Sequence, residues 1–357
     1  MTEHADIPNA PVQTRHIPAL VAGAVGGSLF AFLTLPLAWM LGAMAATMAL
    51  CLGGMSLAVH PWLRSAMIAV LGVFLGSSFS ADLLVQMPGW IPSIGALLVL
   101  GALCAGLAYV VFRQIGRLDA VTAYFASVPG GLSEMALMGE HYGGKAPIIS
   151  LIHVVRIIFV VSVVPFYFRF VQGLSVPSLP PQTVSITVFP LEEAAILTAC
   201  ALFGILLARL VSLPAPALFG PLLLSAGAHI AGFSGTPPPA ECVAGAQVVV
   251  GAAIGARFSG YRLADFKAVV LLGLGTAAVM VLLAALFAAA LAPFVPQNAV
   301  VLFLAFAPGG LAEMSLIALS MDQDPAFIAA LHLIRIMTII TIVTPLFAFA
   351  ANRREPL

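Results

Sequence analysis

The stretch VPGGLSEM at residues 128–135 returns as APGGLAEM at residues 307–314, so the numbering of the two prolines differs by 308 − 129 = 179, half of a chain of 357 residues. Each copy is followed at one fixed distance by the pattern His-x-x-Arg: His153 and Arg156, then His332 and Arg335. Because these residue types keep one register, we interpret the chain as an internal duplication. Function is expected at the repeated residues.

Composition places the chain in a membrane. Hydrophobic residues make up 62% of it and charged residues 8%, with a mean hydropathy of +1.12. A soluble core of this size could not hide so much apolar surface. The formal net charge is zero and no basic run occurs, which argues against direct binding of nucleic acid. The predicted partners are the lipid bilayer and a small molecule or ion.

Hydropathy predicts an all-α polytopic protein with six apolar segments in each half. We expect a first membrane repeat over residues 1–170, an extramembrane linker rich in Pro, Ser and Thr over 171–187, and a second repeat over 188–357. The segments fall at about 16–33, 37–56, 62–79, 90–112, 118–138, 147–169, 188–210, 214–232, 241–258, 267–292, 297–319 and 325–350.

Loop charges decide how the repeats are oriented, since Lys and Arg concentrate on the cytoplasmic side. Of the 14 Lys and Arg residues, Arg156 and Arg335 lie inside apolar segments. If every apolar segment crosses the membrane, seven of the remaining 12 Lys and Arg residues lie on the cytoplasmic side and five lie outside. If instead each Pro-Gly-Gly segment enters and leaves the membrane on the same side, only Arg169 of these 12 residues lies outside. We therefore predict inverted repeats of five spans plus one broken or re-entrant element each, with both termini cytoplasmic.

Proline lacks an N–H group and glycine tolerates strained backbone, so Pro-Gly-Gly stops a helix in mid-segment. Irregular backbone at membrane depth survives only where protein or water surrounds it, and a new half-helix would point its N–H groups at that centre, where an anion could bind. The predicted substrate or ion site takes the duplicated residues Pro129, Gly130, Gly131, Glu134, His153, Arg156, Pro308, Gly309, Gly310, Glu313, His332 and Arg335.

The roles of the ionisable residues stay open at this point. Glu134 and Glu313 are candidate proton or ion sites, because a carboxylate within a membrane is costly, but each could instead cap its own helix or pair with arginine. Arg156 and Arg335 share a helix face with the histidines three residues earlier and serve equally well as substrate clamps or structural partners. The histidines could relay protons or simply pack as neutral groups.

Several other features favour packing over chemistry. The pairs Gly72/Gly76 and Gly251/Gly255, which keep the same offset as the prolines, let membrane helices approach closely. Four cysteines lie singly in apolar surroundings: Cys51, Cys104, Cys200 and Cys242. No catalytic triad, phosphate loop or dinucleotide fingerprint occurs, and the seven histidines are scattered. We predict no enzyme, no cofactor and no metal site.

On the duplicated Pro-Gly-Gly-Leu-x-Glu-Met and His-x-x-Arg motifs, the chain resembles the bacterial membrane AbrB-duplication family over essentially its whole length. The soluble DNA-binding AbrB regulators are unrelated to this membrane family. Its members carry the labels "ammonia monooxygenase" and "regulation of gene expression", neither of which these residues support. The family is also similar to the superfamily of cation/proton antiporters and anion transporters. That resemblance implies a secondary carrier. We expect a multi-pass protein of the bacterial cytoplasmic (inner) membrane, with a second copy of the chain, in a homodimer, as a candidate partner.

Two hypotheses follow from the sequence. The first is a secondary transporter that moves a small polar or anionic solute, coupled to protons or another ion. The second is a membrane-embedded regulatory protein that acts indirectly on gene expression. A copper monooxygenase would need a convergent histidine cluster, which the scattered histidines do not provide.

Overall fold

The computed structural model describes residues 15–80, 86–174, 176–177, 179, 183–213, 215–261, 263–343, 345 and 347. Within these ranges the regular structure consists of helices, with one isolated bridge between Arg15 and Leu57 and no strand. The predicted all-α class is therefore confirmed for the described part of the chain.

The first half contains α1 (His16–Phe32), α2 (Ala38–Leu52), α3 (Pro61–Gly76), the 3-10 turn η1 (Met87–Trp90), α5 (Ile91–Gln114), α6 (Ala120–Ser127), α7 (Leu132–His141), α8 (Ala146–Phe166) and the π turn η2 (Tyr167–Val171). The second half contains η3 (Ile186–Val188), α9 (Leu191–Leu210), α10 (Pro216–Ile230), α11 (Ala240–Gly255), η4 (Ala256–Phe258), α12 (Leu263–Leu291), η5 (Ala292–Phe294), α13 (Ala299–Phe306), α14 (Leu311–Ser320), α15 (Pro325–Thr338) and η6 (Ile339–Val343). The first residues of α13, α14 and α15 follow those of α6, α7 and α8 at the offset of the two motifs.

Five helices of the described residues are long and apolar enough to cross a membrane, whose hydrocarbon core of about 30 Å needs about 20 residues. Other apolar helices, among them α1, α2, α3 and α10, have 15 to 17 residues. The chain is a helical membrane protein. The five long spans are Met87–Gln114, Ala146–Val171, Leu191–Leu210, Ala240–Phe258 and Phe266–Phe294.

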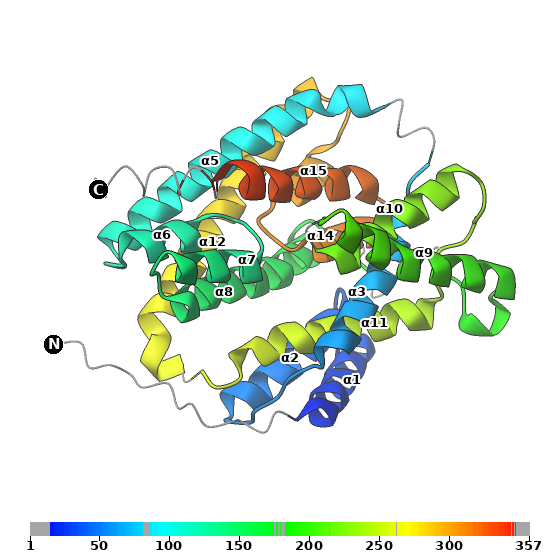
Figure 1. Ribbon diagram of the computed structural model, residues 1–357, viewed down its shortest axis with the longest axis horizontal. Coiled ribbons are helices and arrows are strands. Elements are labelled where there is room, and N and C mark those ends of the chain that lie inside the picture. The colour runs from blue at the N-terminus through cyan, green and yellow to red at the C-terminus, as the bar shows by residue number, and fades with distance from the viewer. Residues whose placement is uncertain are drawn as a thin grey trace.

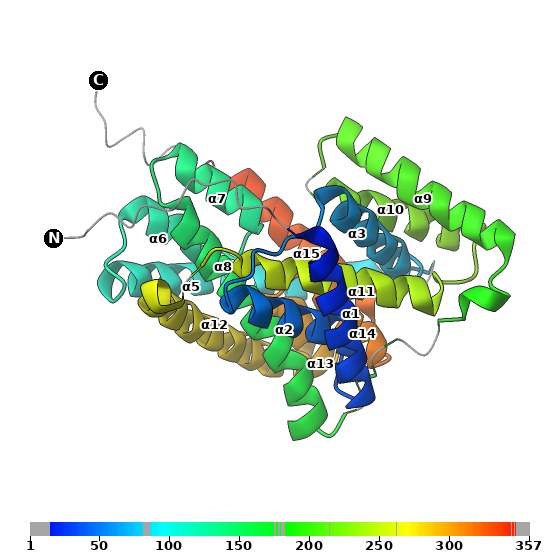
Figure 2. The same ribbon diagram turned by 90° about the horizontal axis from the view of Figure 1, so that it is seen from below.

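The helices form two groups, and each group draws on both halves of the chain. One, the six-helix group, consists of α1, α2, α3, α9, α10 and α11; the other, the hairpin group, consists of α5 to α8 and α12 to α15. Figure 2 shows α3, α9 and α10 on one side of the molecule and α5, α6, α7, α8 and α12 on the other. Contact between the groups runs largely from α3 to α14 and α15, which lie near the middle of Figure 1.

Glycines interlock the two halves within the six-helix group, as their spacing predicted. A Cβ atom at Gly72 or Gly76 would overlap the backbone carbonyl of Leu218 or Leu222 in α10. A Cβ atom at Gly251 would likewise overlap the carbonyl of Met40 in α2. Helices α3 and α11 therefore approach their partners from the other half at backbone contact, which only glycine permits.

This contact predicts a large loss of stability for Gly251→Val. The new side chain meets a backbone carbonyl that cannot rotate away, so α2 and α11 must separate, at a cost of about 1–3 kcal/mol or more. Gly245→Val is the matched control, because a Cβ atom at this position of α11 meets nothing within 4 Å. Thermal unfolding of the two purified variants in detergent measures the difference. Equal melting temperatures would contradict the interlock.

Each Pro-Gly-Gly segment forms the tip of a helical hairpin. The first hairpin consists of α6, the tip at residues 128–131 and α7. Its two ends lie side by side, because the backbone N–H of Lys145, after α7, donates to Thr122 Oγ1, in the first turn of α6, at 2.8 Å. The second hairpin consists of α13, the tip at residues 307–310 and α14. Its two ends are joined in the same way, since Asn298 Nδ2 donates to Gln323 Oε1 at 2.8 Å. Helices of 8 and 10 residues reach about 12 and 15 Å, roughly half of the hydrocarbon core.

Candidate functional site

The tips of the two hairpins meet. Pro129 of the first tip and Pro308 of the second line one cavity of about 20 Å³, together with Arg335 of α15. The remaining walls come from the long helices α5 and α12 and from the end of α13: Leu97, Leu100, Gly101, Cys104, Met280 and Phe306. The structure thus brings together residues from both copies of the motif at the centre of the hairpin group.

The two histidines compensate for what the prolines remove. A residue at position 129 or 308 would normally donate its N–H to the carbonyl four residues earlier, but proline has no N–H. His153 Nε2 donates to the carbonyl of Phe125 at 3.0 Å, and His332 Nε2 donates to the carbonyl of Leu304 at 3.1 Å. Both imidazoles are fully buried. This geometry favours the neutral, hydrogen-bonded histidine over the proton relay.

His332→Leu is expected to cost about 1–3 kcal/mol of folding free energy, the penalty for leaving the Leu304 carbonyl buried and unpaired. In a Pro308→Ala background the cost should shrink, because the substituted alanine can supply the missing N–H group itself. A double-mutant cycle on unfolding in denaturing detergent measures the coupling. Additive effects of the two substitutions would show that histidine and proline are not linked in this way.

Arg335 anchors the second tip through hydrogen bonds to its backbone. Its Nη1 donates to the carbonyl of Ala307 at 2.8 Å, and its Nη2 donates to the carbonyl of Gly309 at 3.0 Å and to His332 Nδ1 at 3.1 Å. These carbonyls lie where α13 ends, so a cation there also complements the negative end of the helix dipole. The Nε donor of Arg335 has no partner among the described residues.

Arg156 occupies the equivalent place in the first copy, but it does not fasten its tip in this way. Only 5% of its surface is exposed. Neither Nε nor Nη1 has a hydrogen-bond partner within the described part of the chain, and the same holds for Nδ1 of His153. Buried donors of a charged group are rarely left unpaired, because each costs several kcal/mol in desolvation. Arg156 is therefore the principal unsatisfied group of the site.

The two guanidinium groups lie within electrostatic range of each other and of the Cys104 thiol on α5. Neither guanidinium group forms an ion pair with a carboxylate of the described residues. Two like charges in a medium of low dielectric constant repel strongly unless an anion is present. The centre of the hairpin group is therefore electropositive and suited to binding an anion.

The two glutamates fold back onto the glycine that precedes their helices. The carboxylate of Glu134 lies where a Cβ atom of Gly131 would be, and that of Glu313 lies where a Cβ atom of Gly310 would be. Both are in the first turn of their helix, where a negative charge complements the dipole. The structure favours this capping position over the Glu134–Arg156 ion pair that the sequence left open.

The hairpins differ in exposure. Every residue of α14 is buried, and Glu313 is 7% exposed, whereas Glu134 in α7 is exposed. Glu313 also lies within electrostatic range of Arg64 on α3, across the contact between the two helix groups. The second hairpin is thus enclosed by protein, and the first one borders the surface.

Two neighbours of the site were not singled out by sequence reasoning. Cys104 lies singly in apolar surroundings, and the matching position in the second copy is Leu283, so no repetition marks it. Arg64 likewise has an apolar residue, Val243, at its matching position. A signal for the histidine partners did exist, since Phe125 and Leu304 each stand four residues before a motif proline. Among the described residues, no three His, Cys, Asp or Glu side chains could hold a metal ion together.

Two short hairpins whose tips meet beside the buried guanidinium group of Arg335 define a helical membrane protein with a cationic site between the tips. The family model described as "Transition state regulatory protein AbrB" matches residues 39–351, and the chain belongs to this AbrB family. It is 25% identical over 352 residues to "Uncharacterized protein YhjN" of Bacillus subtilis (strain 168), covering 92% of this chain and 91% of that protein. It is 23% identical over 308 residues to "Putative regulator AbrB" of Escherichia coli (strain K12), covering 86% and 88%.

Proposed function

We propose that the protein is a secondary transporter for a small polar solute, with anions preferred. The observation that carries the proposal is a pair of buried guanidinium groups: Arg335 lines the cavity where the two hairpin tips meet, and Arg156 lies within electrostatic range of it. Three of their donors have no hydrogen-bond partner among the described residues: Nε and Nη1 of Arg156 and Nε of Arg335. An oxyanion bound there would satisfy these donors in the fork geometry that guanidinium groups favour. The N-terminal ends of α7 and α14 begin at the same tips and add to the positive potential.

The transport mechanism rests on inverted repeats, each with five spans and one re-entrant hairpin. Short hairpins that reach only half of the core, and the eleven-to-one distribution of loop charges, support this arrangement. Transporters of this kind bind substrate near the midplane, where discontinuous helices of the two repeats meet. Glu134 and Glu313 are proposed as the coupling sites for protons or another ion.

Inverted repeats predict which loops face the cytoplasm. In a Cys-less background, Thr187→Cys before α9 should react from outside intact cells with an impermeant thiol reagent. Ala264→Cys, in the segment that starts α12, should react only after the cells are opened. The reverse pattern would make the repeats parallel and would remove the main structural argument for alternating access.

Flux across a bilayer tests the function directly. The full-length protein would be reconstituted into liposomes, and currents or internal pH would be recorded after a jump in the concentration of acetate, succinate, sulfate, phosphate or dodecanoate. We expect saturable flux of at least one anion that depends on Arg156. If no anion moved faster than in protein-free liposomes at any pH gradient, the transporter proposal would fail.

A second function draws on the comparisons. The family model and the Escherichia coli relative are both described as regulators. We propose as the alternative that the protein acts indirectly on gene expression, through a solute that it binds or a protein that it contacts. No enzymatic role is proposed. A deletion strain that carries the Arg156→Gln variant would separate the two functions. Under the alternative, the variant changes transcription without any change in solute flux.

A further inference from the structure

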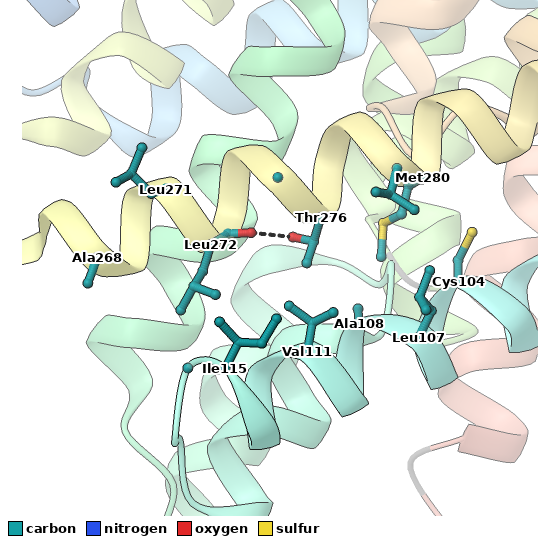
Figure 3. Close-up of a pocket in the computed structure, with 13 residues that line it drawn as sticks. Cys104, Leu107, Ala108, Val111, Ile115, Ala268, Leu271, Leu272, Thr276 and Met280 are labelled. Carbon is teal, nitrogen blue, oxygen red and sulfur yellow. Dashed lines mark hydrogen bonds between the residues drawn. The ribbon is translucent and has the colours of Figure 1, made fainter.

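An apolar groove runs between the two long helices of the hairpin group. It has a volume of about 630 Å³, within the range of about 300–1,000 Å³ that small-molecule sites have. Figure 3 shows α5 along one side, with Ile115, Val111 and Leu107, and α12 along the other, with Leu272 and Thr276. Small residues keep the groove open: Ala108 and Gly116 on the α5 side, Ala268 and Gly275 on α12.

The groove offers almost nothing polar to a ligand. Thr276 is its one hydroxyl-bearing residue among those described, and that hydroxyl already donates to the carbonyl of Leu272 at 2.8 Å, with the carbonyl of Gly273 at 3.1 Å. The other side chains are aliphatic or sulfur-containing. A polar solute would lose hydrogen bonds in this groove, whereas a hydrocarbon chain would gain from the burial of its apolar surface.

One end of the groove adjoins the central cationic site. Cys104 and Met280 line the groove and also line the small cavity that contains Pro129, Pro308 and Arg335. In Figure 3 these two side chains lie together at one end of the groove. The Cys104 thiol is within electrostatic range of both guanidinium groups. A molecule that fills the groove therefore places its end group beside Cys104 and Met280, next to the cavity that Arg335 lines and within electrostatic range of Arg156.

We propose that the substrate is an amphipathic anion: a carboxylate on an unbranched hydrocarbon chain, with its headgroup at Arg156 and Arg335 and its chain in the α5–α12 groove. This inference rests on the proposed function and names the substrate class for the same site. The electropositive end of the groove is complementary to the carboxylate of such a molecule, and the apolar body of the groove is complementary to its hydrocarbon chain. A free fatty acid carries both features in one chain.

The binding test uses the full-length protein in nanodiscs of phosphatidylcholine, with the fluorescent straight-chain cis-parinaric acid as the probe. We expect saturable binding that dodecanoate displaces. Dodecanol should compete about tenfold or more weakly, since it lacks the charged hydrogen-bonding group, and acetate should not compete at the same concentration. Equal displacement by dodecanol and dodecanoate would show that the groove holds only bilayer lipid, and it would overturn the proposal.

Two glycine substitutions test where the hydrocarbon chain of the ligand binds. Gly275→Leu fills the groove, and Gly106→Leu adds the same side chain to α5 outside the groove residues; a Cβ atom at either position meets nothing within 4 Å. We expect Gly275→Leu to weaken probe binding about tenfold or more and Gly106→Leu to leave it unchanged. Arg156→Gln should weaken dodecanoate and leave dodecanol unaffected. Wild-type affinity in Gly275→Leu would overturn the groove assignment.

The outcome also separates this inference from the proposed function. If succinate or phosphate is transported through an Arg156-dependent route, while dodecanoate neither binds nor competes, then the amphipathic substrate is wrong and the transporter stands. If dodecanoate binds with the dependence on Arg156 and Gly275 given above, but no anion crosses the membrane, then the site stands and the transport function fails.

Discussion

Arg156→Gln is expected to reduce anion binding and flux by about 10- to 100-fold while the protein stays as stable as the wild type or becomes more stable. The affinity falls because a charge-assisted hydrogen bond contributes about 1.5–3 kcal/mol. Stability is retained because Nε and Nη1 of Arg156 have no partner among the described residues to lose, and because removal of one guanidinium relieves its repulsion with Arg335. Isothermal titration and thermal unfolding of the same preparation measure both quantities.

Arg335→Gln provides the contrast, since this side chain fastens the second tip through the carbonyls of Ala307 and Gly309. It should lose stability as well as flux. Arg113→Gln serves as a charge control: its guanidinium donates to the nearby carbonyl of Leu118, at the exposed end of α5. If Arg156→Gln unfolded the protein like Arg335→Gln, Arg156 would be a structural residue and not a substrate partner.

Glu313→Gln is expected to abolish flux or remove its dependence on pH. The carboxylate is 7% exposed, at the start of α14, where protonation changes the charge that faces the tip. The amide keeps the size of the side chain and cannot titrate. Glu134→Gln should have the same kind of effect in the first copy. Flux in liposomes at a series of pH values around neutrality, at fixed membrane potential, measures the change.

Glu140→Gln tests whether the effect is specific, because Glu140 is an exposed carboxylate near the other end of α7. It should leave the pH profile unchanged. Unaltered profiles in both Glu134→Gln and Glu313→Gln would leave the glutamates as helix caps only, with a small loss of stability of about 0.3–1 kcal/mol as their whole contribution.

Sequence alone predicted the parts of the fold that follow from local chemistry. A proline without an N–H and two glycines end a helix wherever they stand, so both hairpin tips were foreseeable from Pro129 and Pro308. The close approach of helices at Gly251 followed in the same way from residue size. Spacing also identified every member of the duplicated motif, since the constant offset between the two copies is visible in the chain itself.

The remainder depended on tertiary packing. Nothing in the sequence distinguishes Arg156 from Arg335. Within the described part of the chain, however, Nε and Nη1 of Arg156 make no hydrogen bond, whereas Arg335 donates to the backbone of the second tip. That difference comes from how the two hairpins are seated, which a local pattern does not encode. The groove depends on packing for the same reason: Cys104 and Gly275 line one groove only because α5 and α12 pack against each other.

The bonds that hold the second tip also decide which pieces of the protein can shift together. To slide α13 and α14 past α15 would break three hydrogen bonds at once, from His332 to Leu304 and from Arg335 to Ala307 and Gly309. Each costs about 1–3 kcal/mol when its buried partner is left unpaired. The three helices are therefore held together as one unit, and any movement of one helix group against the other would have to occur at its boundary, where α14 and α15 meet α3.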